Sequence, residues 1–298
     1  PRRMTVTAPT AAQARGQVRR VLGAARSNPT LAAGAVVLGI VVIIAVFAPL
    51  LAPFPADAGN ATHPTQVLLA PSSAHPFGTD EVGRDVLTRV MYGGRTSLEI
   101  VVAVLLIAAA IGIPLGLIAG YFGGIVDQVI MRVTDIFLAF PALLLSLAIA
   151  SVLRPSVGHM ILAIAVTWWP WYTRLVRGEA ASVVRRPYVE SARTLGVSHR
   201  RIIIRHVLPN AATPVLVQIS MDAGGVLLTA AAISFLGLGA QDPTCEWGLM
   251  VSQGATYFTT NWWYATFPGI AILITAMAFN LIGDGVRERL DPRRVLSR

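Results

Sequence analysis

Residues 187–210 read PYVESARTLGVSHRRIIIRHVLPN, a polar, arginine-rich stretch that lies between two long apolar runs. Pro187 suits the first turn of a helix, where a backbone N–H is not needed. Gly196 can adopt the left-handed conformation that ends a helix. Ser198 can then cap a second short helix, which Pro209 is expected to end. The pattern therefore predicts two short helices joined by a glycine bend and exposed to water on one side of a membrane. We call residues 187–210 the hook.

The hook resembles the EAA signature of ABC-importer permeases, through Glu190-Ser191-Ala192, Gly196 and Leu208-Pro209. The family pattern usually has alanine where this chain has Ser191. In that family the corresponding loop, here residues 182–210, is the coupling helix that contacts the cytoplasmic ATPase. The alternative is a basic loop held only by membrane electrostatics. The resemblance implies ATPase-coupling roles for these residues: Glu190, Ser191, Ala192, Gly196, Arg200, Arg201, Leu208 and Pro209.

The composition indicates an integral membrane protein. Of the 298 residues, 54% are hydrophobic and only 13% are charged, whereas soluble domains carry about a quarter charged residues. All 24 basic residues are arginines. Because a Walker A loop needs a lysine to reach the phosphates of ATP, the chain has no nucleotide site of that kind. The single cysteine, Cys245, excludes an internal disulfide and a cysteine-based metal cluster.

The apolar runs predict an all-α protein with six transmembrane helices, each able to cross about 30 Å of hydrocarbon. A basic tail (1–30) precedes the first helix (31–52), which is expected to remain uncleaved. A polar extracytoplasmic segment (53–97) follows, then a permease core (98–286) and a cytoplasmic tail (287–298). Within the core, we expect spans at these positions: 98–120, 128–153, 159–177, 210–238 and 266–283.

The extracytoplasmic segment contains an amphipathic pattern. Thr79 can cap a helix that has Asp80 and Glu81 in its first turn. Apolar residues from Val82 to Met91 fall on one face, so this helix is expected to lie along the outer membrane surface. Residues 75–98 are similar to the segment that marks the C-type permease of dipeptide, oligopeptide and nickel importers. A surface helix without a functional role is the alternative.

Several residues inside the expected spans bear on packing or transport. Gly112, Gly116 and Gly120 are four apart, so they share one helix face and favour close packing of another helix. Pro141 is expected to kink the third span, either as a static bend or for gating. Trp168 and Trp169 lie past the middle of the fourth span, where they either mark a membrane interface or line the pathway.

Asp222 is an isolated acid within the fifth expected span. An ionised carboxylate that faces lipid costs on the order of 2.5 kcal/mol or more, so Asp222 should face the bundle interior or a water-filled pathway. In the first case it forms a helix contact, and in the second it can meet the amino terminus of a peptide. The sequence leaves both roles open.

The distribution of arginine predicts the orientation. Nineteen arginines lie in the N-terminal tail, around the hook and in the C-terminal tail, against four in the expected outer segments. Both termini and the hook are therefore expected in the cytoplasm of a bacterial cell, with the spans in its cytoplasmic (inner) membrane. Because the arginines lie at the ends of apolar runs, the net charge of +9 indicates membrane orientation and not nucleic-acid binding.

The resemblance covers roughly residues 30–295 and implies a type I ABC-importer permease fold. It implies one permease subunit of a binding-protein-dependent importer for dipeptides or oligopeptides, with nickel or haem as alternative cargo. The chain is expected to have no enzymatic activity and no cofactor of its own, with ATP and Mg on partner ATPase subunits. A passive channel would leave the hook without a purpose, and an intramembrane enzyme would lack the motifs HExxH and GxSxG. The implied partners are a second related permease in a heterodimer, two cytoplasmic ATPase domains, an extracytoplasmic substrate-binding protein and the lipid bilayer.

Overall fold

The chain is represented by a computed structural model that describes residues 29–290. The regular structure in this range is helical, apart from an isolated bridge between Thr79 and Asp85. The expected N-terminal tail lies almost entirely outside this range, as does most of the expected C-terminal tail. The helices follow in this order: α2 (Pro29–Val46), α3 (Ala48–Leu51), η1 (Pro55–Ala58), η2 (Pro64–Gln66), α4 (Val86–Phe122), α5 (Gly124–Leu138), α6 (Ala142–Val152), α7 (Val157–Val184), α8 (Pro187–Thr194), α9 (His199–Ile202), η3 (Ile203–Val207), α10 (Leu208–Phe235), α11 (Trp247–Ala255) and α12 (Trp263–Leu290).

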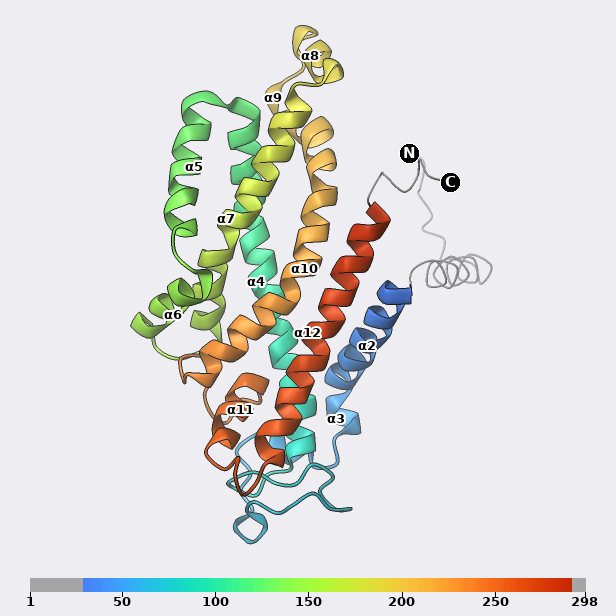
Figure 1. Cartoon of the computed structure of the whole chain (residues 1–298), viewed down its shortest axis with the longest axis vertical. Helices are drawn as coiled ribbons and strands as arrows, with labels where there is room; N and C mark the ends of the chain where they lie inside the picture. The colour runs from blue at the N-terminus through green and yellow to red at the C-terminus, as the bar shows by residue number, and fades with distance from the viewer. Residues whose placement is uncertain (1–28, 291–298) are drawn as a thin grey trace, which may run out of the picture.

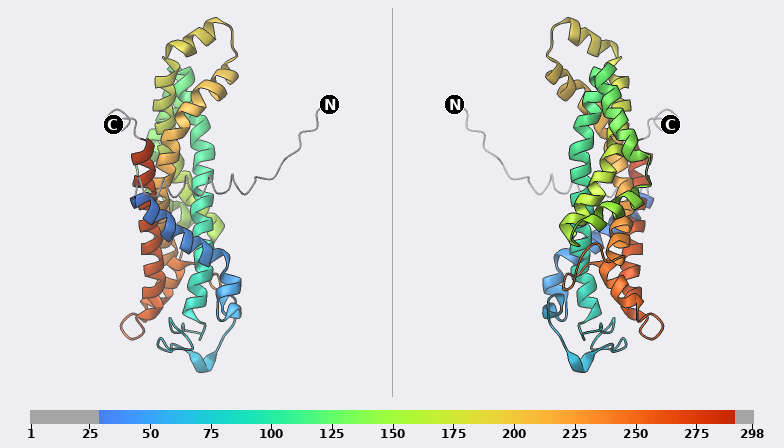
Figure 2. Two further views of the ribbon diagram at one scale, coloured as in Figure 1. Left: turned by 90° about the vertical axis from the view of Figure 1, so that its right-hand side faces the viewer. Right: turned by 90° about the vertical axis from the view of Figure 1, so that its left-hand side faces the viewer.

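The long helices form an elongated bundle (Figure 1). α8 and α9 project at one end, while the segment between α3 and α4 closes the opposite end (Figures 1 and 2). α2 lies against α12, so closely that a Cβ on Gly285 would meet the Leu31 Cβ at 2.5 Å. α2 begins, and α12 ends, at the end of the helix that is nearer the hook (Figure 1).

Within residues 29–290, four helices are long and apolar enough to cross a membrane: Pro29–Val46, Val86–Phe122, Pro214–Phe235 and Trp263–Glu288. The pair α5 and α6, bent by 83°, adds a fifth span if the two helices are counted together. α7 is not among these helices, although it packs along α4. Length and composition thus support four or five of the six expected spans.

The second span begins earlier than expected, and the predicted helix from Thr79 is wrong. α4 is one helix of 37 residues that starts at Val86, with Asp85 as its cap accepting a hydrogen bond from the Thr88 N–H. The residues before it form a loop because Gly78 and Gly83 have φ values of +73° and +88°. Thr79 does not cap a helix; its hydroxyl accepts a hydrogen bond from the Leu69 N–H within this loop.

The third span is broken rather than kinked. α5 ends at Leu138, and Pro141 becomes the residue that precedes α6. Proline has no N–H for the i−4 carbonyl and clashes with it, so the helix ends here. The prediction of a bend at Pro141 is confirmed, and the break is larger than a kink.

The expected outer loop after the fifth span contains an additional helix, α11. Its first turn is capped by Glu246, whose carboxylate accepts from the N–H groups of Gly248 and Leu249 at 2.9 and 2.8 Å. α11 packs between α10 and α12, where a Cβ on Gly248 would meet the Ala231 backbone at 2.6 Å. With nine residues, α11 is much shorter than the run of about 20 apolar residues by which a transmembrane helix is recognised in a sequence.

Candidate functional site

The bend of the hook is a complete helix-ending motif. Gly196 has φ +74°, the left-handed conformation predicted from the sequence. The Gly196 N–H donates to the Arg193 carbonyl at 3.0 Å, and the Val197 N–H donates to the Ala192 carbonyl at 3.1 Å. These two bonds are those of the Schellman motif, which satisfies the last carbonyls of α8. The hook is therefore a defined structure and not a loose loop.

The hook has a buried apolar side and an exposed polar side. Val189, Ile202 and Val207 are fully buried and pack in a cluster with residues of α4, α7 and α10. The opposite side is exposed, and Leu195 at the bend is 83% exposed. Apolar burial thus holds the hook to the bundle, while its polar side is free to contact another protein.

The second half of the hook differs from the prediction. Ser198 precedes α9, but its side chain makes no capping hydrogen bond. Pro209 does not end the helix: α9 continues through the π-helical turn η3 into α10, with Pro209 in the first turn of α10. In the π turn, the Leu208 N–H bonds to the Ile203 carbonyl, five residues back. We attribute the continuation of the helix past Pro209 to this change of hydrogen-bond pattern. The π turn lets α10 start anew, and proline fits the first turn of a newly started helix.

The residues to which the sequence assigned coupling roles lie along the hook. Six of them are exposed, of which five lie before Leu208: Glu190, Ser191, Gly196, Arg200 and Arg201. Ser191 is held within α8, since its hydroxyl donates to the Pro187 carbonyl at 2.9 Å. Ala192 and Leu208 are partly buried, and Pro209 is exposed. The hook therefore exposes an acidic, a hydroxyl and two basic side chains.

A second group of polar residues lies inside the bundle, at Asp222 on α10. Its Oδ1 accepts from Gln218 Nε2 at 2.9 Å. The fully buried Tyr172 of α7 lies next to Asp222. By hydrogen-bond geometry, however, Asp222 Oδ2 and Tyr172 Oη both lack a partner within the described residues. Two buried polar atoms without partners are unusual and mark a place where water or a ligand group would be stabilised.

The two tryptophans lie near this group but differ in their surroundings. Trp169 is 7% exposed and meets Phe137 of α5 edge-on, with ring centroids 5.4 Å apart. Trp168 is partly buried, and its ring lies 3.8 Å from where a Cβ on Gly225 would be. Both side chains therefore pack between spans.

The three glycines of the second span lie against α7. A Cβ on Gly112, Gly116 or Gly120 would come within 2.7 Å of a backbone oxygen and a Cβ of α7 in each case. Real Cβ atoms do not approach that closely, so only glycine permits this separation of the helices.

The sequence matches the family of binding-protein-dependent transport system inner membrane components over residues 112–295. This chain belongs to that family. Residues 16–71 also match the N-terminal transmembrane domain of oligopeptide transport permease C. It is therefore a C-type permease subunit of an ABC importer, integral to the inner membrane. The ATPase activity lies in separate subunits.

Three relatives cover most of the permease. It is 45% identical over 268 residues to the probable D,D-dipeptide transport system permease of Escherichia coli strain K12, with 90% of this chain and 89% of the relative covered. The dipeptide transport system permease of Alkalihalophilus pseudofirmus is 41% identical, with 90% and 87% covered. The glutathione transport system permease of Pectobacterium atrosepticum is 40% identical, with 90% and 88% covered.

Solved structures share the fold of the permease. A methionine ABC transporter in an inward-facing conformation matches with a TM-score of 0.54 at 18% identity, covering 69% of this chain and 97% of that chain. An amino acid ABC transporter matches with a TM-score of 0.52 at 14% identity, covering 68% and 95%. The permease therefore has the all-helical type I ABC-importer fold.

The end of the bundle opposite the hook contains a buried charge cluster that sequence reasoning missed. Arg84 bonds to Asp80 through Nε at 2.7 Å and to Asp242 through Nη2 at 3.0 Å. Arg89, which is fully buried, lies 3.6 Å from Asp80 and 3.7 Å from Asp242. Burial opposes ionisation of Asp242, but hydrogen bonds and charge from Arg84 outweigh it and hold the pKa of Asp242 below its ordinary value. The cluster thus fastens the loop before α4 to the loop before α11.

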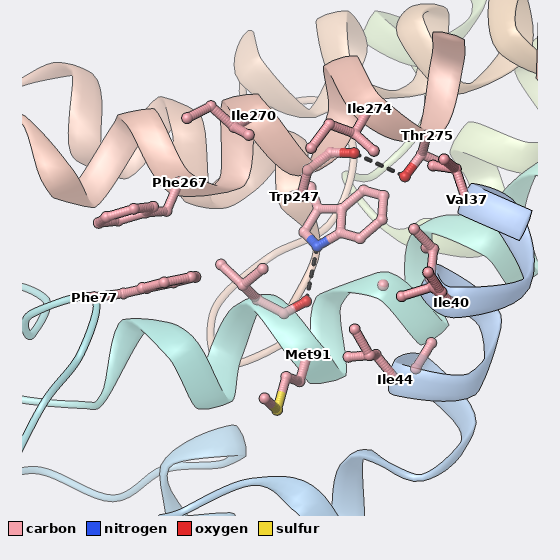
Figure 3. A pocket seen from close by; sticks show the side chains of 15 residues that line it. Val37, Ile40, Ile44, Phe77, Met91, Trp247, Phe267, Ile270, Ile274 and Thr275 are labelled. Atoms are coloured by element: carbon pink, nitrogen blue, oxygen red, sulfur yellow. Dashed lines mark hydrogen bonds between the residues drawn. The ribbon is translucent and has the colours of Figure 1, made fainter. Parts of the chain in front are cut away.

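A lateral cavity of about 410 Å³ lies between α2, α4 and α12, with Trp247 at its wall (Figure 3). Its polar groups are already bonded: Trp247 Nε1 donates to the Val90 carbonyl at 2.8 Å, and the Thr275 hydroxyl donates to the Ala271 carbonyl at 2.7 Å. The remaining lining is apolar. Because the charged ends of a peptide would be unpaired there, this cavity is not a peptide site.

Proposed function

We propose that this permease forms half of the pathway of an ATP-driven importer for dipeptides or oligopeptides. The observation that carries the proposal is the hook, an ordered and exposed element at one end of a bundle of the type I fold. The names of the relatives support a peptide cargo, because the systems named for them transport a D,D-dipeptide, a dipeptide and glutathione.

The proposed topology has six spans, with both termini and the hook in the cytoplasm. The third span is the pair α5 and α6, and α7 is the fourth. Nineteen of the 24 arginines then lie on the hook side or in the tails, as the positive-inside rule requires. The described ends of α2 and α12 on the hook side of the bundle support the same orientation.

The partners follow from the same proposal. A second, related permease completes the pathway as a heterodimer, and an extracytoplasmic binding protein delivers the peptide. Two ATPase domains hold ATP and Mg and contact the exposed side of the hook, where Glu190, Arg200 and Arg201 lie. When these domains close, they displace the hook, and the spans reorient so that the pathway opens alternately outward and inward.

Thiol labelling tests this topology. With Cys245 replaced by serine, a cysteine at Ser72 is expected to react with a membrane-impermeant thiol reagent in spheroplasts, because it lies in the outer loop. A cysteine at Ser182, at the inner end of α7, is expected to react only after the membrane is permeabilised. Labelling of position 182 in sealed spheroplasts would overturn the orientation.

Asp222 is proposed as an acid that lines the pathway and meets the amino terminus of a peptide. Its Oδ2 and the Tyr172 hydroxyl, which have no hydrogen-bond partner among the described residues, support this role. Asp222→Asn keeps the shape of the side chain but removes its charge. Uptake of peptides with a free amino terminus is therefore expected to fall about tenfold, which corresponds to the loss of one hydrogen bond to a charged group. Uptake of amino-terminally acetylated peptides should change less.

Uptake of radiolabelled peptides into whole cells measures this effect. Ser220→Ala on the same helix is the control, since the one hydrogen bond of the Ser220 hydroxyl among the described residues goes to the Leu216 carbonyl of its own helix. If Asp222→Asn cells take up free and acetylated peptides at wild-type rates, the carboxylate has only a packing role.

A further inference from the structure

The last turn of α4 is bonded to both helices of the hook. Tyr121 is 4% exposed, and its hydroxyl shares a hydrogen bond of 2.6 Å with His199 Nδ1 of α9. The guanidinium carbon of Arg193, in α8, lies 4.7 Å from the centre of the Tyr121 ring. The neighbouring Phe122 ring is 5.9 Å from His199. One side chain of the bundle thus contacts α8 and α9 at once.

This contact differs from the apolar packing beneath the hook. The apolar packing of buried residues such as Val189 and Ile202 is non-directional, so it fixes the orientation of the hook less closely than a contact with a set geometry does. A hydrogen bond weakens steeply when its geometry is disturbed. A cation over an aromatic ring is similarly restricted in position. The Tyr121 contacts therefore oblige α4 to follow a displacement of the hook.

α4 can carry such a displacement through the whole subunit. It is continuous over 37 residues, about 55 Å at 1.5 Å per residue. Tyr121 lies in its last turn, at the inner end, and its outer end follows Asp85 at the buried charge cluster of Arg84, Asp80 and Asp242. Along its inner half, the glycine face at Gly112 and Gly116 fixes it to α7.

The joint after Tyr121 separates α4 from α5. Gly123 and Gly124 both have positive φ, +64° and +55°, and a Cβ on either would contact none of the described residues within 4 Å. Glycine at two successive unrestrained positions makes this the most readily bent point next to Tyr121. Because this joint can bend, α4 can move with Tyr121 without having to move α5 as well.

We propose that Tyr121 is the positioning residue that transmits movement of the hook to α4, through its hydrogen bond with His199 and its contact with Arg193. The proposal rests on the coupling function of the hook proposed above. In this proposal the last turn of α4 moves with the hook, and α4 transmits that movement along its length to the outer end of the permease.

The test uses the complete transporter in proteoliposomes and measures peptide uptake and ATP hydrolysis in the same sample. Tyr121→Phe removes the hydroxyl but keeps the ring, so the fold is retained. The number of peptides imported per ATP hydrolysed is expected to fall about fivefold, which corresponds to the net free energy of one typical hydrogen bond. ATP hydrolysis itself is expected to continue. His199→Ala should give the same loss, and the double variant Tyr121→Phe/His199→Ala no greater loss than either alone. His199→Asn, which places a polar atom near the position of Nδ1, should restore most of the ratio.

Tyr92→Phe is the matched control, because it makes the same change near the outer end of α4, and its transport ratio should equal that of the wild type. Two results would overturn the proposal: a wild-type ratio in Tyr121→Phe, or losses that multiply in the double variant. If the hook does not couple ATP hydrolysis to transport at all, Gly196→Val will also transport normally. That result distinguishes failure of the proposed function from failure of the role of Tyr121. If Gly196→Val uncouples and Tyr121→Phe does not, the hook couples by another contact.

Discussion

Replacement of Gly196 by valine is expected to abolish peptide uptake while the permease remains folded in the membrane. Gly196 has φ +74°, and a Cβ there would meet no atom of residues 29–290 within 4 Å, so the strain is confined to the backbone. The left-handed conformation costs a residue with a Cβ about 1–2 kcal/mol, and a β-branched residue more. Because the bend sets the angle between α8 and α9, valine is expected to displace the exposed side of the hook from the ATPase.

The matched control is Gly196→Asn. Asparagine tolerates the left-handed conformation, so this variant is expected to transport at near wild-type rate although its side chain is larger than hydrogen. Uptake in cells and copurification of the ATPase with the tagged permease measure both variants. Equal amounts of the two variants in the membrane would show that the difference does not arise from folding. Equal uptake by both would contradict the assigned role of the bend.

Replacement of Gly116 by leucine is expected to prevent stable folding of the bundle. A Cβ at Gly116 would lie 2.6 Å from the Thr173 carbonyl oxygen and 2.7 Å from the Val176 Cβ. Since a backbone atom cannot move aside as a side chain can, α4 and α7 must separate. Overpacking of a well-packed core costs about 1–3 kcal/mol, and a backbone contact belongs at the upper end. The expected result is a small monodisperse fraction in detergent and a lower melting temperature.

Gly178→Leu on α7 provides the control for Gly116. Gly178 is also inside a long helix, but a Cβ there would meet nothing within 4 Å in the part of the chain that the structure describes, so leucine is expected to leave folding unchanged. The two substitutions share their chemistry and their helical context and differ in the space available. A melting temperature lowered equally in both would mean that the loss of glycine itself, and not the approach of α4 to α7, is responsible.

Features that depend on local sequence were predictable. The bend at Gly196 follows from a glycine placed after a helical turn, and the helix start at Pro187 from the conformation of proline. The break at Pro141 has the same kind of cause. Apolar runs likewise located most of the long helices, because the bilayer sets their length.

Features that depend on distant contacts were not predictable. Asp242 pairs with Arg84 across 158 positions of the chain, and no spacing rule connects them. α11 was missed because it is short and is stabilised by packing on α10 and α12. The start of α4 was misplaced because Thr79 and Asp85 are both good caps, and only the loop contacts of Thr79 decide between them. The contact of Tyr121 with His199 joins residues 78 positions apart and was found only in three dimensions.

The central claim is that the hook couples ATP hydrolysis to transport, and its most direct test is made with the purified transporter in proteoliposomes. Peptide uptake and the stimulation of ATP hydrolysis by the binding protein are measured together for the wild type, Gly196→Asn and Gly196→Val. The prediction is that Gly196→Val loses uptake and that its ATP hydrolysis no longer responds to the binding protein, whereas Gly196→Asn behaves as the wild type. Wild-type uptake by Gly196→Val, with hydrolysis still stimulated, would contradict the claim.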